Sequence, residues 1–224
     1  KHYWQKTIYK PMENIIAILA LTSGVTSLLC LLILHFVSRE FDPGWRMISE
    51  YALGKHKWLI TSFFILWGVS SLFVSLMLWP VVSGTWGRIG LVLLLISAVG
   101  EIMGGLFDVR HKLHGFSFLL GVPALPVAAL LVSYDLIHLE GWHEHSTALL
   151  YSAHSTWISL VLMGMGMAVM ISGFKKAGLP MDKDAAPPEK LPEGVIAWAG
   201  YANRLLVLCY VMWLVQVAGI FLSM

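Results

Sequence analysis

The amino-acid sequence predicts an all-α fold, a polytopic membrane helix bundle with six transmembrane helices. Hydrophobic residues make up 58% of the 224 residues and charged residues only 12%, and the mean hydropathy is +0.75. A soluble domain is typically about 45–50% apolar and about 25% charged. A globule of this length has no interior that could bury the excess, whereas lipid accepts it as a solvent.

Six apolar segments are each long enough to cross the roughly 30 Å of hydrocarbon in a bilayer. They span residues 15–37, 58–79, 89–107, 115–134, 148–174 and 196–224. The first is long enough to be a true span rather than a cleaved signal peptide. Because the spans and their loops use nearly the whole chain, residues 1–224 are expected to form a single membrane-embedded domain. Residues 175–194, rich in Pro, Lys and Asp, are expected to form a flexible polar loop between the fifth and sixth helices.

The distribution of charge bears on location and partners. The first, third and fifth loops hold ten Lys and Arg residues, against four in the N-terminal segment and second loop. The positive-inside rule therefore places those three loops in the cytoplasm, and we expect a protein of the bacterial cytoplasmic membrane. A net charge of +2 excludes a nucleic-acid binder driven by bulk charge. The expected partners are membrane lipids and partner subunits within the membrane.

Two charged residues fall inside apolar segments, where an unpaired charge is costly. Glu101 lies seven residues before Asp108, or about 10 Å below the membrane surface at the helical rise. Arg204 lies at a similar depth in the sixth span. We therefore predict that Glu101 and Arg204 form a buried ion pair inside the bundle, which would fix helix packing.

Histidine and carboxylate side chains gather at the same membrane face as the predicted ion pair. Asp108 ends the third span, His111 and His114 flank the start of the fourth, and His56 precedes the second. Imidazole and carboxylate are ligands that suit zinc. We predict a catalytic site of Asp108, His111, His114 and His56, with Asp108, His111 and His114 holding the metal. The alternative is that these histidines only touch water and lipid headgroups at the interface.

Two short motifs carry a resemblance to a known family. The first is Ser49-Glu50-Tyr51-Ala52-Leu53-Gly54, before the second span. The second is Gly105-Leu106-Phe107-Asp108, followed by His111 and His114. With six spans, these motifs resemble the bacterial membrane family filed as domain of unknown function 998, over about residues 14–224. The family commonly has a proline after the phenylalanine of the second motif, where this chain has Asp108. The resemblance implies the six-helix architecture and no particular reaction.

Several functions agree with these features. The first hypothesis is a lipid-binding protein or a metal-dependent intramembrane hydrolase, with a polar pocket at one membrane face that includes Ser49. A metal-bound water would attack a lipid ester or amide. The alternative is a non-catalytic accessory subunit of a larger membrane complex. A b-type haem protein would need a second histidine facing His154, so we expect no haem. A small transporter would use Pro123 and Pro126 to break the fourth helix.

Overall fold

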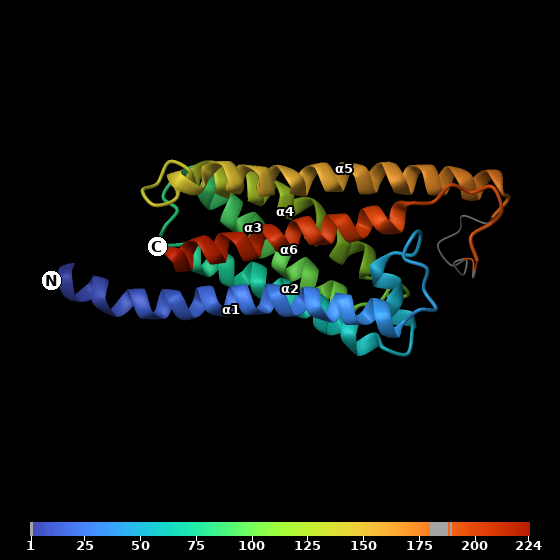
Figure 1. The fold of residues 1–224 in the computed structure, drawn as a ribbon, viewed down its shortest axis with the longest axis horizontal. Helices are drawn as coiled ribbons and strands as arrows, with labels where there is room; N and C mark the ends of the chain where they lie inside the picture. Colours follow the sequence, from blue (N-terminus) through green and yellow to red (C-terminus); the bar gives the residue numbers. More distant parts are fainter. Residues whose placement is uncertain (1, 180–187, 189) are drawn as a thin grey trace.

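A computed structural model describes residues 2–179, 188 and 190–224 and confirms the all-helical prediction (Figure 1). The long helices are α1 (His2–Val37), α2 (Lys57–Leu78), α3 (Thr85–Leu106), α4 (His114–Leu136), α5 (Ser146–Lys176) and α6 (Ala199–Ser223). Two short 3₁₀ helices, η1 (Ile48–Leu53) and η2 (His143–His145), lie in loops. No strand occurs in this part of the chain. Six helices are long and apolar enough to span a membrane, so the chain is an integral membrane protein.

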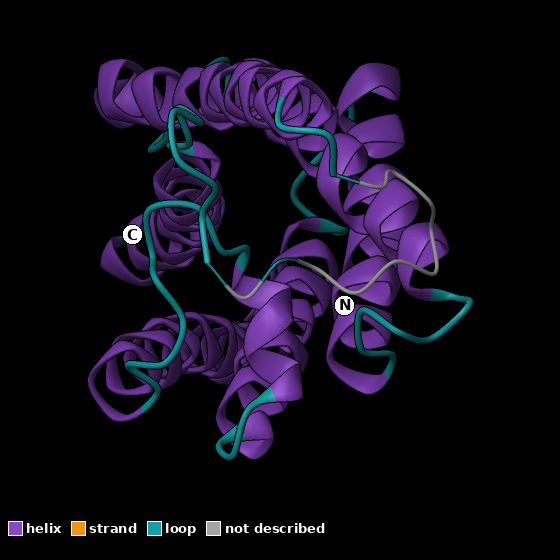
Figure 2. Ribbon diagram, turned by 90° about the vertical axis from the view of Figure 1, so that its right-hand side faces the viewer, coloured by secondary structure: helices purple, strands orange, loops and turns teal. Residues whose placement is uncertain are grey.

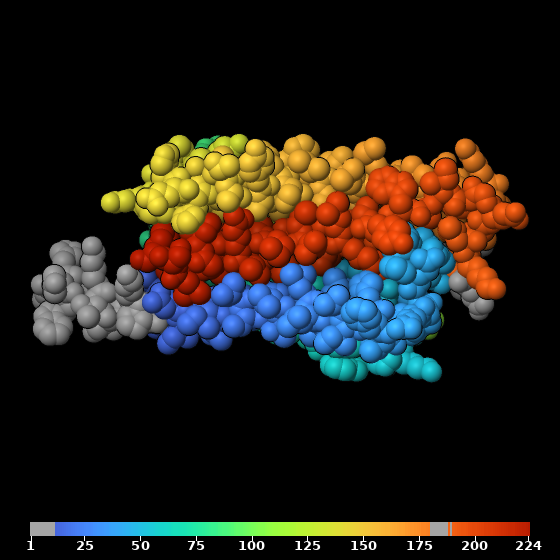
Figure 3. Space-filling view, viewed as in Figure 1, coloured from blue at the N-terminus to red at the C-terminus, as the bar shows by residue number. Residues whose placement is uncertain are grey.

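The helices run along the long axis of the bundle. The C-terminus and the start of α1 lie toward one end, and the loops after α1, α3 and α5 lie at the other (Figure 1). We call this second end, made by residues 38–56, 107–113, 177–179 and 190–198, the loop face. Figure 2 shows the bundle from that side. On the face seen in Figure 3, α6 lies between α1 and α5.

Serine and threonine hydroxyls join neighbouring helices by donating to backbone carbonyls. Ser70 Oγ donates to Ala20 O at 2.8 Å, linking α2 to α1. Ser75 Oγ donates to Leu91 O at 3.0 Å, linking α2 to α3. Such bonds satisfy polar side chains where lipid offers no partner, and they hold helices in register.

Helices α3 and α4 approach each other most closely at two glycines. A Cβ atom built on Gly100 would meet the backbone nitrogen of Gly121 and lie 2.7 Å from its Cα. Only a residue without a side chain permits this approach. The contact sets the position of the first half of α4 relative to α3.

Helix α4 passes through both of its prolines without a break, although the sequence suggested a break at Pro123 and Pro126. Pro126 has no N–H to donate to Val122 O, the carbonyl one turn earlier. Tyr210 Oη of α6 donates to that carbonyl at 2.8 Å instead. Because a neighbouring helix supplies the missing hydrogen bond, the observation that favoured a transporter is removed.

Two loops differ from the sequence interpretation. Residues 38–57, which the sequence places between the first and second spans, include η1 and bury Trp45, Ile48 and Tyr51 against the bundle. The predicted loop at 175–194 begins later, because Lys175 and Lys176 complete α5. Residues 180–187 and 189 of that loop lie outside the described residues.

The close approach at Gly100 predicts that a glycine-to-alanine substitution on α3 destabilises the protein at one position and not at another. Gly100→Ala should destabilise the protein by about 1–3 kcal/mol, because the added methyl meets backbone that cannot move aside. Gly104→Ala is the matched control, since its Cβ would lie 3.4 Å from Phe64, an ordinary contact. Thermal unfolding in detergent measures both. Equal melting temperatures for the two variants would contradict the close approach of α3 and α4.

Candidate functional site

Asp108 lies on the loop face in an ion pair, not in a ligand cluster. Lys57 Nζ donates to Asp108 Oδ2 at 2.7 Å, and Arg110 N donates to Asp108 Oδ1 at 3.1 Å. The hydrogen bond from Lys57 lowers the pKa of the Asp108 carboxyl. Both oxygens therefore already have partners within the protein.

The predicted histidines each have a separate partner. His56 Nδ1 lies 3.1 Å from Ser38 Oγ, and His114 Nδ1 lies 2.9 Å from Phe107 O. His111 Nδ1 accepts from Leu113 N at 3.2 Å, and its ring stacks on Phe107. Among the described residues, no group of three or more His, Cys, Asp and Glu side chains is placed to hold a metal ion. The zinc site therefore stays a prediction.

The predicted Glu101–Arg204 ion pair is not formed, because each residue has other partners. Ser71 Oγ of α2 donates to Glu101 Oε2 at 2.7 Å. Ser97 Oγ of α3 lies 2.7 Å from Glu101 Oε1. The depth argument correctly placed Glu101 inside the bundle, where it is 3% exposed. It did not foresee that two serine hydroxyls would take the place of the guanidinium.

Arg204 instead joins α6 to α1 and to the first loop. Its guanidinium donates to His35 Nε2 at 2.6 Å, to Arg46 O at 2.8 Å and to Tyr51 Oη at 2.9 Å. A guanidinium only donates, so His35 Nε2 accepts, and Nδ1 donates its proton to Leu31 O at 2.6 Å. Burial raises the pKa of the Tyr51 phenol, which therefore keeps its proton. Arg204 thus anchors η1 against the bundle.

His154, the candidate haem ligand, also has partners at both ring nitrogens. Trp157 Nε1 donates to His154 Nδ1 at 2.9 Å. Tyr134 Oη lies 3.2 Å from His154 Nε2. The absence of haem remains a prediction, and in this structure His154 links α4 to α5.

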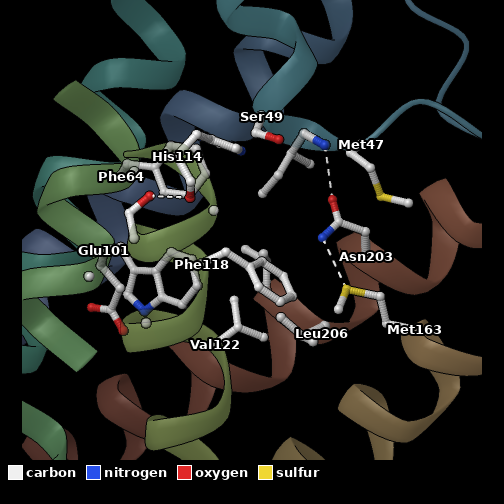
Figure 4. Close-up of a pocket in the computed structure, with 18 of the residues that line it drawn as sticks. Met47, Ser49, Phe64, Glu101, His114, Phe118, Val122, Met163, Asn203 and Leu206 are labelled. Atoms are coloured by element: carbon white, nitrogen blue, oxygen red, sulfur yellow. Dashed lines mark hydrogen bonds between the residues drawn. The ribbon is translucent and has the colours of Figure 1, made fainter. Parts of the chain in front are cut away.

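A cavity of about 290 Å³ lies inside the bundle, near the loop face (Figure 4). Its walls come from η1 and from every long helix except α1. Most of the lining is apolar: Ile48, Phe64, Trp67, Phe118, Val122, Met163, Met167, Leu206 and Val207. The polar lining side chains are Ser49, Glu101, His114, Ser117 and Asn203. We call this cavity the bundle pocket.

At the level of the bundle pocket, α4 and α5 pack against different neighbours. The first half of α4 packs on α3 through Gly100 and Gly121. The last half of α5 packs on the start of α6, where a Cβ on Gly166 would lie 3.1 Å from Ala199 Cα. Met170 of α5 forms a small core cluster with Trp45 and Ala199. The pocket occupies the space between these two separate contacts.

The bundle pocket has two polar ends. At the outer end, near the loop face, lie Ser49, His114 and Asn203 (Figure 4). At the inner end lies Glu101, beside Gly121 in the middle of the bundle. His114 and Gly121 are seven residues apart on α4, which corresponds to about 10 Å. The arrangement can bind a mainly apolar molecule that carries polar atoms.

Sequence reasoning identified part of this site. Ser49, Glu101 and His114 were singled out, but for a hydrolase or an ion pair. Phe118 and Met163 were missed, because apolar residues in a span look the same whether they face a pocket or pack against another helix, and Asn203 was missed as well. The polar Asn203, next to Arg204 in an apolar segment, was the signal that could have indicated the outer end.

The Lys57–Asp108 pair predicts a small pH dependence of stability. The pKa of Asp108 is lower in the folded state, so the pair stabilises the protein above the unfolded carboxyl pKa of about 3.9 and loses this effect as pH falls. Lys57→Met should raise the pKa of Asp108 and cost less than about 1 kcal/mol, because the pair is solvent-exposed. Carboxyl NMR titration measures the pKa. An unchanged pKa in the variant would refute the pairing.

The hydrogen bonds around Arg204 predict a larger loss of stability when the hydroxyl group of Tyr51 is removed. Tyr51→Phe removes the acceptor of Arg204 Nη2 and the donor to Phe41 O. Two partly buried groups then lack a partner, so the variant should lose about 1–3 kcal/mol. Tyr151→Phe is the control, since that side chain is 75% exposed. Denaturation in detergent measures the stability of both variants. If both are as stable as the wild type, the hydrogen-bond network around Arg204 is contradicted.

Comparison with known proteins places the chain in a family. The model of the family described as "Protein of unknown function (DUF998)" matches residues 21–219. No curated protein and no solved structure matches. The match covers most of the chain and confirms the resemblance of the two motifs; the chain belongs to the DUF998 family.

Proposed function

We propose that the protein binds a single apolar chain of a membrane lipid in the bundle pocket. The observation that supports this proposal is a cavity lined mainly by apolar side chains within the transmembrane bundle, with polar side chains at its outer end. Its volume of about 290 Å³ is at the lower end of the range of about 300–1,000 Å³ for small-molecule sites. This size fits one chain or a compact headgroup rather than a whole two-chain lipid.

The chemistry of the walls suits a lipid chain. Phe64 and Phe118 offer flat apolar surfaces, and Met163 and Met167 adapt to irregular shapes because their side chains are unbranched. The outer end lies where α4 begins at His114, near the level expected for lipid headgroups. A lipid could therefore keep its polar group near the interface with its chain inside.

A metal-dependent hydrolase receives less support from the geometry. Asp108 is paired with Lys57, and His111 stacks on Phe107, so neither lines the bundle pocket. His114 is the one predicted site residue among Asp108, His111, His114 and His56 that does. The accessory-subunit hypothesis remains open, and a lipid inside the bundle could also serve such a subunit as a structural component.

Blocking the bundle pocket tests the proposal. A monoacylglycerol with a photoactivatable chain, added to the protein in lipid nanodiscs, should label pocket residues such as Phe118 and Met163. Val122→Trp should abolish this labelling, because the indole fills the cavity. Leu119→Trp is the matched control. Leu119 lies on α4 one turn before Val122, is 63% exposed and does not line the pocket.

Mass spectrometry of the labelled peptides decides the result. Labelling confined to outward-facing residues in the wild type, or equal pocket labelling in the wild type and Val122→Trp, would refute lipid binding in the pocket. The accessory-subunit hypothesis would then have more support than lipid binding.

A further inference from the structure

A groove lies on the outer surface of the turn that joins α2 to α3. This turn is at the end of the bundle that holds the C-terminus, because α2 starts at the loop face and runs along the bundle (Figure 1). The groove has a volume of about 370 Å³. Its lining residues are Trp79, Ser83, Thr85, Arg88, Ile89, Val92 and Leu93. None of them lines the bundle pocket, so this groove, which we call the turn groove, is a separate site.

The polar end of the turn groove contains one cation. Arg88 lies one helical turn after the start of α3 at Thr85, and it is exposed. Its guanidinium lies 5.7 Å from the centre of the Trp79 ring, within the range of a cation–π contact. Among the side chains that the structure describes, no Asp or Glu lies within ion-pair distance of Arg88. The indole therefore holds the guanidinium at the groove without neutralising its charge.

The acid close to this turn, Asp135 of α4, lies on another side of α3. A Cβ atom built on Gly84 or Gly87 would meet the Asp135 carboxyl group, so this group lies directly against the start of α3. Asp135 lines a different groove, together with Trp86 and Tyr134, and it does not line the turn groove. The turn groove therefore keeps a positive charge at its polar end.

Two hydroxyl groups line the groove together with this charge. Ser83 precedes α3, Thr85 is the first residue of α3, and both side chains are exposed. Each hydroxyl can donate one proton, and a guanidinium can donate to two oxygen atoms of a phosphate at once. The lining contains no carboxylate that would repel a phosphate. The polar end of the turn groove therefore has the chemistry of a phosphate site.

The other half of the turn groove is apolar. Ile89, Val92 and Leu93 line it, and residues 85, 88, 89 and 92 recur at the spacing of one helix face. From residue 85 to residue 92 the helix rises about 10 Å, from the membrane interface toward the middle of the bilayer. The groove thus presents polar groups at the interface and apolar groups below them. A phospholipid has the same order, with its phosphate at the interface and its acyl chains below.

We propose that the turn groove binds an anionic glycerophospholipid such as phosphatidylglycerol, with the phosphate at Arg88 and the first part of one acyl chain against Ile89 and Val92. A lipid with a choline or ethanolamine headgroup also has a phosphate, but it brings a second cation next to the guanidinium. The lining has no carboxylate to receive that cation. This proposal goes beyond the proposed function and does not depend on it, because the two sites share no lining residue.

Photocrosslinking tests where the lipid binds. The probe is a phosphatidylglycerol with a photoactivatable group in the acyl chain close to the glycerol, added at low mole fraction to phosphatidylcholine nanodiscs that hold the protein. Mass spectrometry should find the label in peptides of residues 79–93. Labelling that avoids these residues in the wild type would overturn the proposal.

Arg88→Gln tests the polar end. This variant should lower the labelling of residues 79–93 about three- to fivefold, the effect expected for an exposed ion pair. Arg39→Gln is the matched control, because Arg39 is an exposed arginine at the loop face, and it should leave the labelling of residues 79–93 unchanged. Equal labelling of these residues in Arg88→Gln and the wild type would overturn the proposal.

Val92→Trp tests the apolar half. The indole fills the space below Arg88, so this variant should also lower the labelling of residues 79–93. Val99→Trp is the control, because Val99 lies two turns further along α3, is 52% exposed and does not line the groove. The same loss of labelling in both variants would overturn the placement of the acyl chain in the turn groove.

Competition identifies the chemistry of the ligand. Unlabelled phosphatidylglycerol should displace the probe about three- to fivefold better than phosphatidylethanolamine, or than a diacylglycerol with the same chains, at equal mole fraction. Equal displacement by diacylglycerol would show that the phosphate is not recognised, and equal displacement by phosphatidylethanolamine would show that the net charge is not. Displacement by soluble glycerol 3-phosphate as effective as that by phosphatidylglycerol would assign the groove to a free phosphate. Each of these three results would overturn the proposal.

Discussion

The hydrogen-bond group around Glu101 determines how the middle of the bundle is assembled. A carboxyl group in the hydrocarbon region must find its partners within the protein, because lipid offers none. Glu101 finds them in Ser71 of α2 and Ser97 of its own helix, and Ser97 reaches the backbone of α4 at Gly121. Three helices are therefore held at one level by three side chains. The absence of a side chain at Gly100 lets α4 come close enough for this contact.

A second polar group, around Arg204, performs the same task at the loop face. The guanidinium holds the end of α1 through His35 and the first loop through Arg46 O and Tyr51. Asn203, the preceding residue, accepts a hydrogen bond from Ile48 N at 2.9 Å. These bonds draw η1 down onto α6, where it closes one side of the bundle pocket. The pocket therefore lies between two polar groups that both have structural reasons to be where they are.

The sequence predicted the helices well because their cause is local and strong. Each span must satisfy its own backbone hydrogen bonds in lipid, so an apolar segment of sufficient length is a helix almost regardless of its neighbours. The predicted span 58–79 differs from α2 by one residue at each end. The first loop was less predictable, because its buried residues contact partners far away in the sequence: Tyr51 contacts Arg204, and Trp45 packs with Met170 and Ala199.

The site was predictable only in part for a related reason. Depth along a helix follows from residue number, so Glu101 was correctly placed inside the bundle. Arg204, predicted at a similar depth, instead lies nearer the loop face, where it bonds to the end of α1 and to the first loop. Which neighbouring helix a side chain faces depends on the rotation of its own helix about the helix axis. It also depends on the hydrogen-bond partners that the neighbouring helices offer, and the sequence reveals neither. Two serines, at positions 71 and 97, were closer partners for Glu101 than the distant arginine. Serine is common in membrane helices, and nothing in its immediate sequence distinguishes one that meets a carboxyl group from one that bonds its own helix.

The separation of the two polar groups explains why a pocket persists between them. If Glu101 and Arg204 were paired, α3 and α6 would have to meet at these two side chains. Each group instead has its own partners: Glu101 bonds to Ser71 of α2 and Ser97 of α3, and Arg204 bonds to α1 and the first loop. Polar groups in lipid tolerate little displacement without losing a bond. The helices are therefore fixed at positions that leave about 290 Å³ unfilled, and an apolar guest can occupy this space without breaking either network.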